Sequence, residues 1–362
     1  MSLKILVDSG EFWRHLEADI GAAKKSVFIQ TMTFDADEAG RRAAEALTQA
    51  KAPDRRTLVD TVSQYIISDH FIYAPRYCLW ESLRRECRDT RRLKLDLERQ
   101  GVRVKMTNPY GSLWIHFLAR NHKKLAVIDG AVAYIGGINF SDHNFSWHDM
   151  MLRIEDREVA SFLEKDFFST WEGRNQFGSK TFKNMDLWIG DGRSNPRMFR
   201  AIFEAVRRAR KEIFIESTYF SMPFFEMLRG IRSPRPKVTL LTSAVNNWTP
   251  MQNYIPWESW RSGIRLRYYP ERLTHLKAIL VDDRSLIMGS SNFEFFSQAL
   301  YQEIVAIIHD PGIISEFKEK VMLPDLEKSI SPERRVRPLR GYVRSLQFRL
   351  LANLSRKLAF LE

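Results

Sequence analysis

The stretch NHKKLAVIDGAVAYIGGINF at residues 121–140 decides the fold, because THLKAILVDDRSLIMGSSNF at residues 274–293 repeats its design. Each stretch has a histidine, a lysine two residues later and an aspartate five residues after the lysine. A glycine, then a glycine or serine, and an asparagine follow at matching intervals. A lone HxK arises by chance in many chains, whereas six specified positions that occur twice at fixed spacing are a strong signal. The members are His122, Lys124, Asp129, Gly136, Gly137 and Asn139 in the first copy, and His275, Lys277, Asp282, Gly289, Ser290 and Asn292 in the second.

The repetition extends outward from these two stretches. Residues 3–34 and 187–220 each predict a strand, a turn, an amphipathic helix and a buried strand. Each half then closes with a strand and a helix, the strands at 150–156 and 302–310. Strands that alternate with helices predict an α/β fold of two similar lobes, each a mainly mixed or parallel sheet flanked by helices. We expect the two lobes to be related by pseudo-twofold symmetry.

The 362 residues are enough for two domains of ordinary size and a short tail. We predict a first lobe at 1–178, a second lobe at 179–330 and a C-terminal segment at 331–362. The first half also carries a stretch rich in arginine and aromatic residues at about 55–95. It predicts a helical insertion near the substrate entrance.

The net charge of +12 indicates an anionic partner, which is a nucleic acid, an anionic membrane surface or a phosphorylated substrate. Cys78 and Cys87 lack the partners of a zinc site and indicate reduced thiols in a reducing compartment. The sequence begins without a signal peptide, and no apolar run approaches the roughly 20 residues that cross a bilayer. We therefore expect a cytoplasmic protein that is soluble or peripheral on the cytoplasmic face of the membrane.

The segment 331–362 carries eight basic and two acidic residues, a net charge of +6. At helical spacing, its apolar residues fall on one face. They are Val343, Leu346, Leu350, Leu354, Leu358 and Leu361. A basic amphipathic helix is typical of binding to an anionic membrane surface, and the alternative is a helix that packs on the body of the protein.

The residue types of the duplicated motif suit attack on a phosphodiester. Histidine and lysine two apart on a strand point to the same face. One histidine can attack phosphorus while the other protonates the leaving oxygen, and the lysines neutralise the phosphate oxygens. The glycines allow the backbone to approach the phosphate, and Asn139 and Asn292 donate hydrogen bonds. We expect no cofactor for this chemistry.

Each histidine also needs a carboxylate that fixes its tautomer and stabilises the imidazolium. Asp149 lies 27 residues after His122, and Glu303 lies 28 residues after His275. Both open the closing strand of their repeat, and we assign them this supporting role. Gln30 and Glu216 occupy matching places on the second strand of each repeat and are further candidates for the cleft.

The sequence resembles the phospholipase D superfamily, whose signature is this duplicated HxKxxxxD motif. NHKKLAVIDGAVAYIGGINFSD, WHDMMLRIED and VFIQTMTF are most similar to bacterial cardiolipin synthases, and the resemblance covers about residues 1–320. It implies a two-lobed fold, a covalent phosphohistidine and no metal. It also implies that His122 is the nucleophile and His275 the general acid, although the roles can be reversed. Asp129 and Asp282 are then structural supports.

Three functions compete. The first is a phosphatidyltransferase or phospholipase D that acts on anionic phospholipid, which the cardiolipin synthase-like segments and the basic tail favour. The second is a nuclease of the same superfamily, which the charge permits, but nucleic acid is the less favoured partner because no known RNA-binding module is present. The third is a non-catalytic relative, which both intact motifs argue against. With two motifs in one chain, a monomer suffices for the active site, and a dimer is compatible with it.

Overall fold

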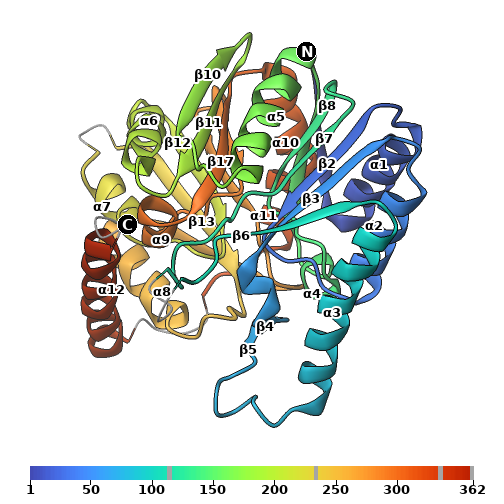
Figure 1. Cartoon of the computed structure of the whole chain (residues 1–362). Coiled ribbons are helices and arrows are strands. Elements are labelled where there is room, and N and C mark those ends of the chain that lie inside the picture. The colour runs from blue at the N-terminus through green and yellow to red at the C-terminus, as the bar shows by residue number, and fades with distance from the viewer. Residues whose placement is uncertain (112–115, 232–234, 333–336, 359–362) are drawn as a thin grey trace. The chain divides into compact units, whose positions relative to one another are not determined.

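The chain folds into two compact units, Met1–Gln176 and Phe177–Glu362 (Figure 1). The structure, a computed structural model, describes residues 1–111, 116–231, 235–332 and 337–358. Each unit has its own sheet with helices on both faces, so the α/β fold of two similar lobes is confirmed. Among the described residues, no helix has both the length and the apolar character needed to cross a membrane.

The first unit is built on a seven-stranded mixed sheet of order β1-β9-β8-β7-β2-β3-β6. β2, β3 and β6 run parallel, and the other neighbours run antiparallel. The strands are β1 (Ser2–Val7), β2 (Ser26–Thr31), β3 (Asp54–Asp60), β6 (Arg103–Thr107), β7 (Leu125–Ile128), β8 (Val132–Gly136) and β9 (Met150–Glu155). The helices are α1 (Asp8–Ala22), α2 (Glu38–Gln49), α3 (Glu81–Arg99), α4 (Asp142–Phe145) and α5 (Arg157–Trp171).

Alternation along β2 explains why helices cover both faces of this sheet. Val27 and Ile29 point into the core formed with α1 and α2. Phe28 points to the opposite face, where its ring stacks on Phe167 of α5 with a centroid distance of 5.1 Å.

The second unit repeats the same strand order with one more strand at the edge, β10-β11-β17-β16-β15-β12-β13-β14. Its strands are β10 (Gly178–Phe182), β11 (Met185–Asp191), β12 (Glu212–Ser217), β13 (Lys237–Ser243), β14 (Arg265–Tyr269), β15 (Lys277–Val281), β16 (Ser285–Gly289) and β17 (Gln302–Ile308). Its helices are α6 (Asn195–Arg207), α7 (Phe224–Arg229), α8 (Met251–Ser262), α9 (Phe295–Ala299), α10 (Pro311–Phe317), α11 (Leu323–Lys328) and α12 (Pro338–Leu358), with a π-helical turn, Lys318–Met322, between α10 and α11.

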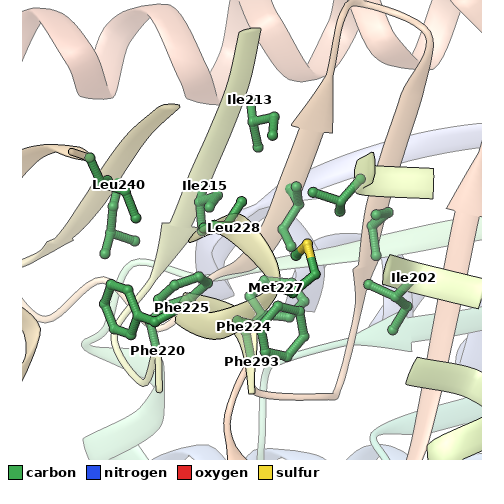
Figure 2. Close-up of a cluster of buried hydrophobic side chains, with 14 of the residues drawn as sticks. Ile202, Ile213, Ile215, Phe220, Phe224, Phe225, Met227, Leu228, Leu240 and Phe293 are labelled. Atoms are coloured by element: carbon green, nitrogen blue, oxygen red, sulfur yellow. The ribbon is translucent and has the colours of Figure 1, made fainter. Parts of the chain in front are cut away.

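Aromatic side chains dominate the core of the second unit. Figure 2 shows Phe220, Phe224, Phe225 and Phe293 gathered beside Ile215 of β12. Their rings meet mostly edge to face, the arrangement that aromatic quadrupoles favour. This core therefore packs α6 and α7 onto one face of the sheet.

The expected helical insertion at about 55–95 is wrong in its extent. Residues 54–60 form β3, an interior strand between β2 and β6, and Leu58, Val59 and Asp60 are buried there. α3 has a counterpart in α8, since each lies between the second and third parallel strands of its unit. The additional part is therefore the segment from about residue 61 to 80. It contains a 3-10 turn, Thr61–Gln64, and the short hairpin of β4 (Ile66–Ile67) and β5 (His70–Phe71) rather than a long helix.

A buried ion pair attaches α5 to the sheet of the first unit. The Nζ of Lys123 lies 2.7 and 2.8 Å from the two carboxylate oxygens of Asp166, and both side chains are at most 2% exposed. The corresponding position of the second motif is Leu276, which is fully buried. The repeat therefore solves the same packing problem once with a charge pair and once with an apolar side chain.

We predict that Asp166→Ala destabilises the protein by about 3–5 kcal/mol, because it leaves the Lys123 ammonium buried without its partner. The double variant Lys123→Leu/Asp166→Leu, which has at position 123 the leucine found in the second repeat, replaces the buried ion pair by apolar side chains and is expected to be close to wild type in stability. Urea denaturation followed by circular dichroism measures both. A single variant as stable as the double one would contradict this account.

Candidate active site

The aspartate of each motif binds backbone rather than facing the histidine. Asp129 follows β7 with φ of +52°, and its carboxylate accepts hydrogen bonds from the amides of Lys24, Lys25 and Ser26. The distances are 2.7 to 2.9 Å. Partial burial acts to raise the pKa of Asp129, but the three backbone donors outweigh it and hold the pKa below its usual range.

Asp282 does the same in the second unit. It follows β15 with φ of +50° and accepts hydrogen bonds from the amides of Arg210, Lys211 and Glu212. Here too burial is outweighed by the backbone donors, which lower the pKa of Asp282. In each unit the motif aspartate thus joins the motif strand to the beginning of the neighbouring central strand.

The histidine and lysine of each motif are buried beside each other. His122 and Lys124 lie just before β7, and the Nζ of Lys124 is 2.7 Å from the carbonyl oxygen of His122. In the second unit, the Nζ of Lys277 is 2.9 Å from the Nδ1 of His275 and also donates to its carbonyl oxygen. The exposed fractions of the two histidines are 6% and 5%. Each HxK is therefore a compact pair of basic side chains inside its own unit.

A buried polar network holds the residue that precedes each histidine. In the first unit, the carboxylate of Asp60 accepts a hydrogen bond of 2.6 Å from the amide of Asn121 and pairs with Arg120 at 2.9 Å. In the second unit, the hydroxyl of Ser243 accepts a hydrogen bond of 2.8 Å from the amide of Thr274. Asp60 and Ser243 end equivalent strands, so the same task falls to a carboxylate in one unit and to a hydroxyl in the other.

The charge of Asp60 depends on its partners. Complete burial raises the pKa of its carboxyl group to about 6, although Arg120 and the amides of Val62 and Asn121 lower it. Sequence reasoning missed Asp60, Arg120 and Ser243. The two repeats share no residue type at this strand end, so only the alignment of the strands identifies the equivalence.

The sequence repeat predicts that Gln30 and Glu216 occupy matching positions, and in the structure they do. Gln30 lies opposite Leu125, and Glu216 lies opposite Ala278, which in each case is the residue after the motif lysine. The amide of Gln30 donates to the side chain of Asn121 at 2.9 Å, and the Glu216 carboxylate accepts from the hydroxyl of Thr274 at 2.6 Å. Both side chains thus support the residue before the histidine.

Asn139 is held by the last residue of β2 and the first residue of the loop that follows it. Its Oδ1 accepts hydrogen bonds from the hydroxyl of Thr31 at 3.0 Å and from the amide of Met32 at 3.2 Å. This fixes the side-chain oxygen toward the loop and turns the NH₂ group of the amide away from it. Asn292, its counterpart, is 8% exposed.

Asp149 and Glu303, the predicted orienting carboxylates, each lie against the residue that follows the motif glycine. The length of the carboxylate side chain matches the size of that residue. A Cβ on Gly137 would lie 2.3 and 2.4 Å from the carboxylate oxygens of Asp149, so a larger residue there would force this carboxylate to move. At the equivalent position of the second unit, Ser290 donates its hydroxyl to Glu303, and Ser297 donates to the other oxygen at 2.8 Å. The short carboxylate thus accompanies glycine, and the long carboxylate accompanies serine.

The first glycine of each pair allows two strands to approach closely. A Cβ on Gly136 would lie 2.4 Å from the carbonyl oxygen of Met150, and one on Gly289 would lie 2.1 Å from that of Ile304. The backbone of β8 or β16 therefore contacts the closing strand at the residue that follows Asp149 or Glu303. The pairing of the two histidines across the units stays a prediction.

Comparison with known proteins gives consistent results along the chain. The family model described as "Cardiolipin synthase, PLD-like domain" matches residues 16–171 and 202–322. A cardiolipin synthase of Listeria welshimeri is 22% identical over 91% of this chain and 70% of its own length. Cardiolipin synthase 1 of Bacillus cereus is 23% identical over 98% of this chain and 71% of its own length.

Two solved structures share the fold. Phosphatidylserine synthase of Haemophilus influenzae Rd KW20 superposes with a TM-score of 0.70 at 16% identity, covering 98% of this chain and 95% of that one. Polyphosphate kinase of Porphyromonas gingivalis gives a TM-score of 0.60 at 12% identity, covering 98% of this chain and 56% of that one. At these identities, the likeness concerns the fold.

We predict that Gly137→Ser lowers the melting temperature, because the new Cβ and hydroxyl collide with the carboxylate of Asp149. Adding Asp149→Glu recreates the arrangement of Ser290 and Glu303 and is expected to recover part of the loss. Differential scanning calorimetry of the two variants and of Asp149→Glu alone separates the effects by a double-mutant cycle. Strictly additive effects would show that the two positions do not compensate each other.

Proposed function

Since the chain belongs to the cardiolipin synthase PLD-like domain family and is a phosphotransferase of the phospholipase D type, we propose that it transfers a phosphatidyl group from an anionic phospholipid to an alcohol through a covalent phosphohistidine. The observation that carries the proposal is that both motifs are intact, each with a buried histidine and a lysine folded back onto it. A chain that only bound lipid would have no need of two such pairs.

In the proposed reaction, an imidazole nitrogen of His122 attacks phosphorus, and the bond from phosphorus to the leaving oxygen breaks. His275 gives its proton to that oxygen, so the head-group alcohol leaves and a phosphatidyl-histidine remains. An acceptor alcohol then attacks phosphorus and returns a proton to His275, while the bond from phosphorus to nitrogen breaks. Water in place of the alcohol would give phosphatidic acid, which is the hydrolase alternative.

The remaining motif residues have supporting roles in this proposal. Lys124 and Lys277 neutralise the non-bridging phosphate oxygens as charge develops. Asn139 and Asn292 donate hydrogen bonds to the phosphate. Asp149 and Glu303 orient the two histidines and stabilise their imidazolium forms. The two imidazoles supply nucleophile and acid, so the chemistry calls for no metal.

We predict that the purified protein converts phosphatidylglycerol vesicles to cardiolipin, and that turnover continues in the presence of a chelator. His122→Ala and His275→Ala should each lower turnover by about 10³-fold or more, because each removes a group that forms or breaks a bond in every cycle. Mass spectrometry of the lipids measures the products.

The outcomes of this experiment discriminate among the candidates. Phosphatidic acid without cardiolipin would indicate a hydrolase. If the lipids do not change, and the protein cleaves nucleic acid in a reaction that His122→Ala abolishes, the protein is a nuclease and the proposal is wrong. Near-normal turnover in either histidine variant would contradict the pairing of the two motifs.

We further propose that α12 attaches the protein to the anionic surface on which such a substrate lies. One face of the helix packs on the second unit, where the ring of Phe348 stacks on Tyr254 at 4.2 Å and the hydroxyl of Ser345 donates to Glu258 at 2.6 Å. Gly341 is required on this face because a Cβ would lie 2.4 Å from Trp257. The docking face is therefore small and aromatic rather than leucine-rich.

The opposite face of α12 is apolar and exposed. Its side chains are 42% to 77% exposed, and they follow one another at intervals of three or four residues; they are Leu339, Val343, Leu346, Leu350 and Leu354. The helix has five basic residues and no acidic one. An exposed apolar stripe on a basic helix suits the headgroup layer of an anionic bilayer. The sequence left two alternatives for this helix, packing on the body of the protein and binding to a membrane. The two are compatible, because they use opposite faces of α12.

We predict that the protein sediments with phosphatidylglycerol vesicles and much less with phosphatidylcholine vesicles. Leu350→Glu/Leu354→Glu should weaken vesicle binding by roughly tenfold or more, because each leucine contributes about 1.5–3 kcal/mol when buried in lipid. Leu323→Glu in α11, another exposed leucine, is the control and should bind like wild type. Equal binding by all three proteins would contradict the assignment, and a dimer broken by the double variant would assign the face to a second copy.

A further inference from the structure

A group of three carboxylates lies in the first unit, and none of them belongs to the duplicated motif. Asp35 and Asp37 come from the loop between β2 and α2, and Glu86 comes from α3. One oxygen from each lies within 4.8 Å of the other two. Asp35 is only 1% exposed, and its Oδ1 has no hydrogen-bond partner among the described residues. A buried carboxylate oxygen without a donor is rare and calls for a partner.

Most of the charged groups around Asp35 are negative. Burial and the nearby Asp37 raise the pKa of Asp35 well above its usual range, and burial and Asp37 also raise the pKa of Glu86. Lys94 is the cation that acts against this at Asp35, but its Nζ donates to the hydroxyl of Ser63 at 2.8 Å. Burial also lowers the pKa of Lys94 to about 8.

The spacing of the oxygens fits a hard divalent cation. Ca²⁺ binds oxygen at about 2.3–2.6 Å, so two of its ligands are at most about 5 Å apart. An open cavity of about 340 Å³ adjoins Glu86 and has room for water ligands. Its lining residues are Ala36, Glu81, Ser82, Arg85, Glu86 and Asp89. Mg²⁺ demands a stricter octahedral arrangement, whereas Ca²⁺ accepts carboxylates at irregular angles.

We propose that Asp35, Asp37 and Glu86 bind a divalent cation, Ca²⁺ in preference to Mg²⁺, as a structural site separate from the phosphoryl chemistry. The cation would connect α3 to the loop that follows β2. One hydrogen bond already joins them, from the amide of Ala36 to the hydroxyl of Thr90 at 2.9 Å. Met32 of this loop and Thr31, the last residue of β2, hold the side-chain oxygen of Asn139. A cation there stabilises the segment on which the position of Asn139 depends.

Calorimetric titration of the chelator-treated full chain with calcium chloride tests the proposal. We expect saturable binding of one Ca²⁺, weaker binding of Mg²⁺, and a higher melting temperature with Ca²⁺. Asp35→Asn and Glu86→Gln should each weaken the binding by roughly tenfold or more, because the charge of the ligands sets the affinity. Glu98→Gln removes one carboxylate from an exposed position of the same helix and is the matched control.

The melting temperature of Asp35→Asn without a cation is a second test. Without a cation, Asp35→Asn should melt at a higher temperature than wild type, because it removes one of several crowded like charges from a buried position. With Ca²⁺ the order should reverse. Absence of saturable binding at millimolar Ca²⁺, or equal binding by wild type and Asp35→Asn, would overturn the proposal.

These measurements use the protein alone, so they succeed or fail independently of lipid turnover. If a chelator lowers lipid turnover in wild type, Glu86→Gln identifies the source. A chelator effect that disappears in Glu86→Gln belongs to this site. One that persists belongs to the phosphoryl chemistry and counts against the metal-free reaction.

Discussion

The carboxylates of Asp129 and Asp282 provide the constraint on which the rest of each unit depends. Each accepts three backbone amides at the beginning of the central strand, β2 or β12. This fixes the register between the central strand and the motif strand beside it. The histidine and lysine lie at the other end of that motif strand, so their positions follow from the register. The motif aspartate thus stabilises the fold, while the motif histidine and lysine carry the proposed chemistry.

The two units reach the same geometry by different residues, which separates what the fold requires from what it tolerates. Gly137 with Asp149 and Ser290 with Glu303 fill the same space with carboxylates of different length. Asp60 and Ser243 hold the same backbone amide with a charged and a neutral acceptor. Lys123 with Asp166 occupies a position that Leu276 fills in the other repeat. Where both repeats agree, at His, Lys, Asp, Gly and Asn, a substitute would alter the site or the strand contact itself.

α12 shows how one helix can present two surfaces with different tasks. The face that packs on α8 has glycine, serine, phenylalanine and alanine, which allow a close approach of the helix axes. The leucines lie on the opposite side of the helix, where they are exposed to water. Burial of those leucines against lipid would recover hydrophobic free energy that docking on the protein does not provide.

The sequence by itself determined the duplication, the two-lobed α/β fold and the residues of both motifs, because these depend on spacing and on period-two and helical periodicity within short segments. It also placed Gln30 and Glu216 at matching positions. Only the tertiary structure decided that residues 54–60 form an interior strand, that Asp60, Arg120 and Ser243 support the motifs, and which face of α12 packs inward. It also brought Asp35 and Asp37 next to Glu86. These features depend on contacts between residues far apart in the chain. Such contacts leave no periodic trace in the local sequence, since a buried position constrains volume and hydrogen bonding rather than residue type.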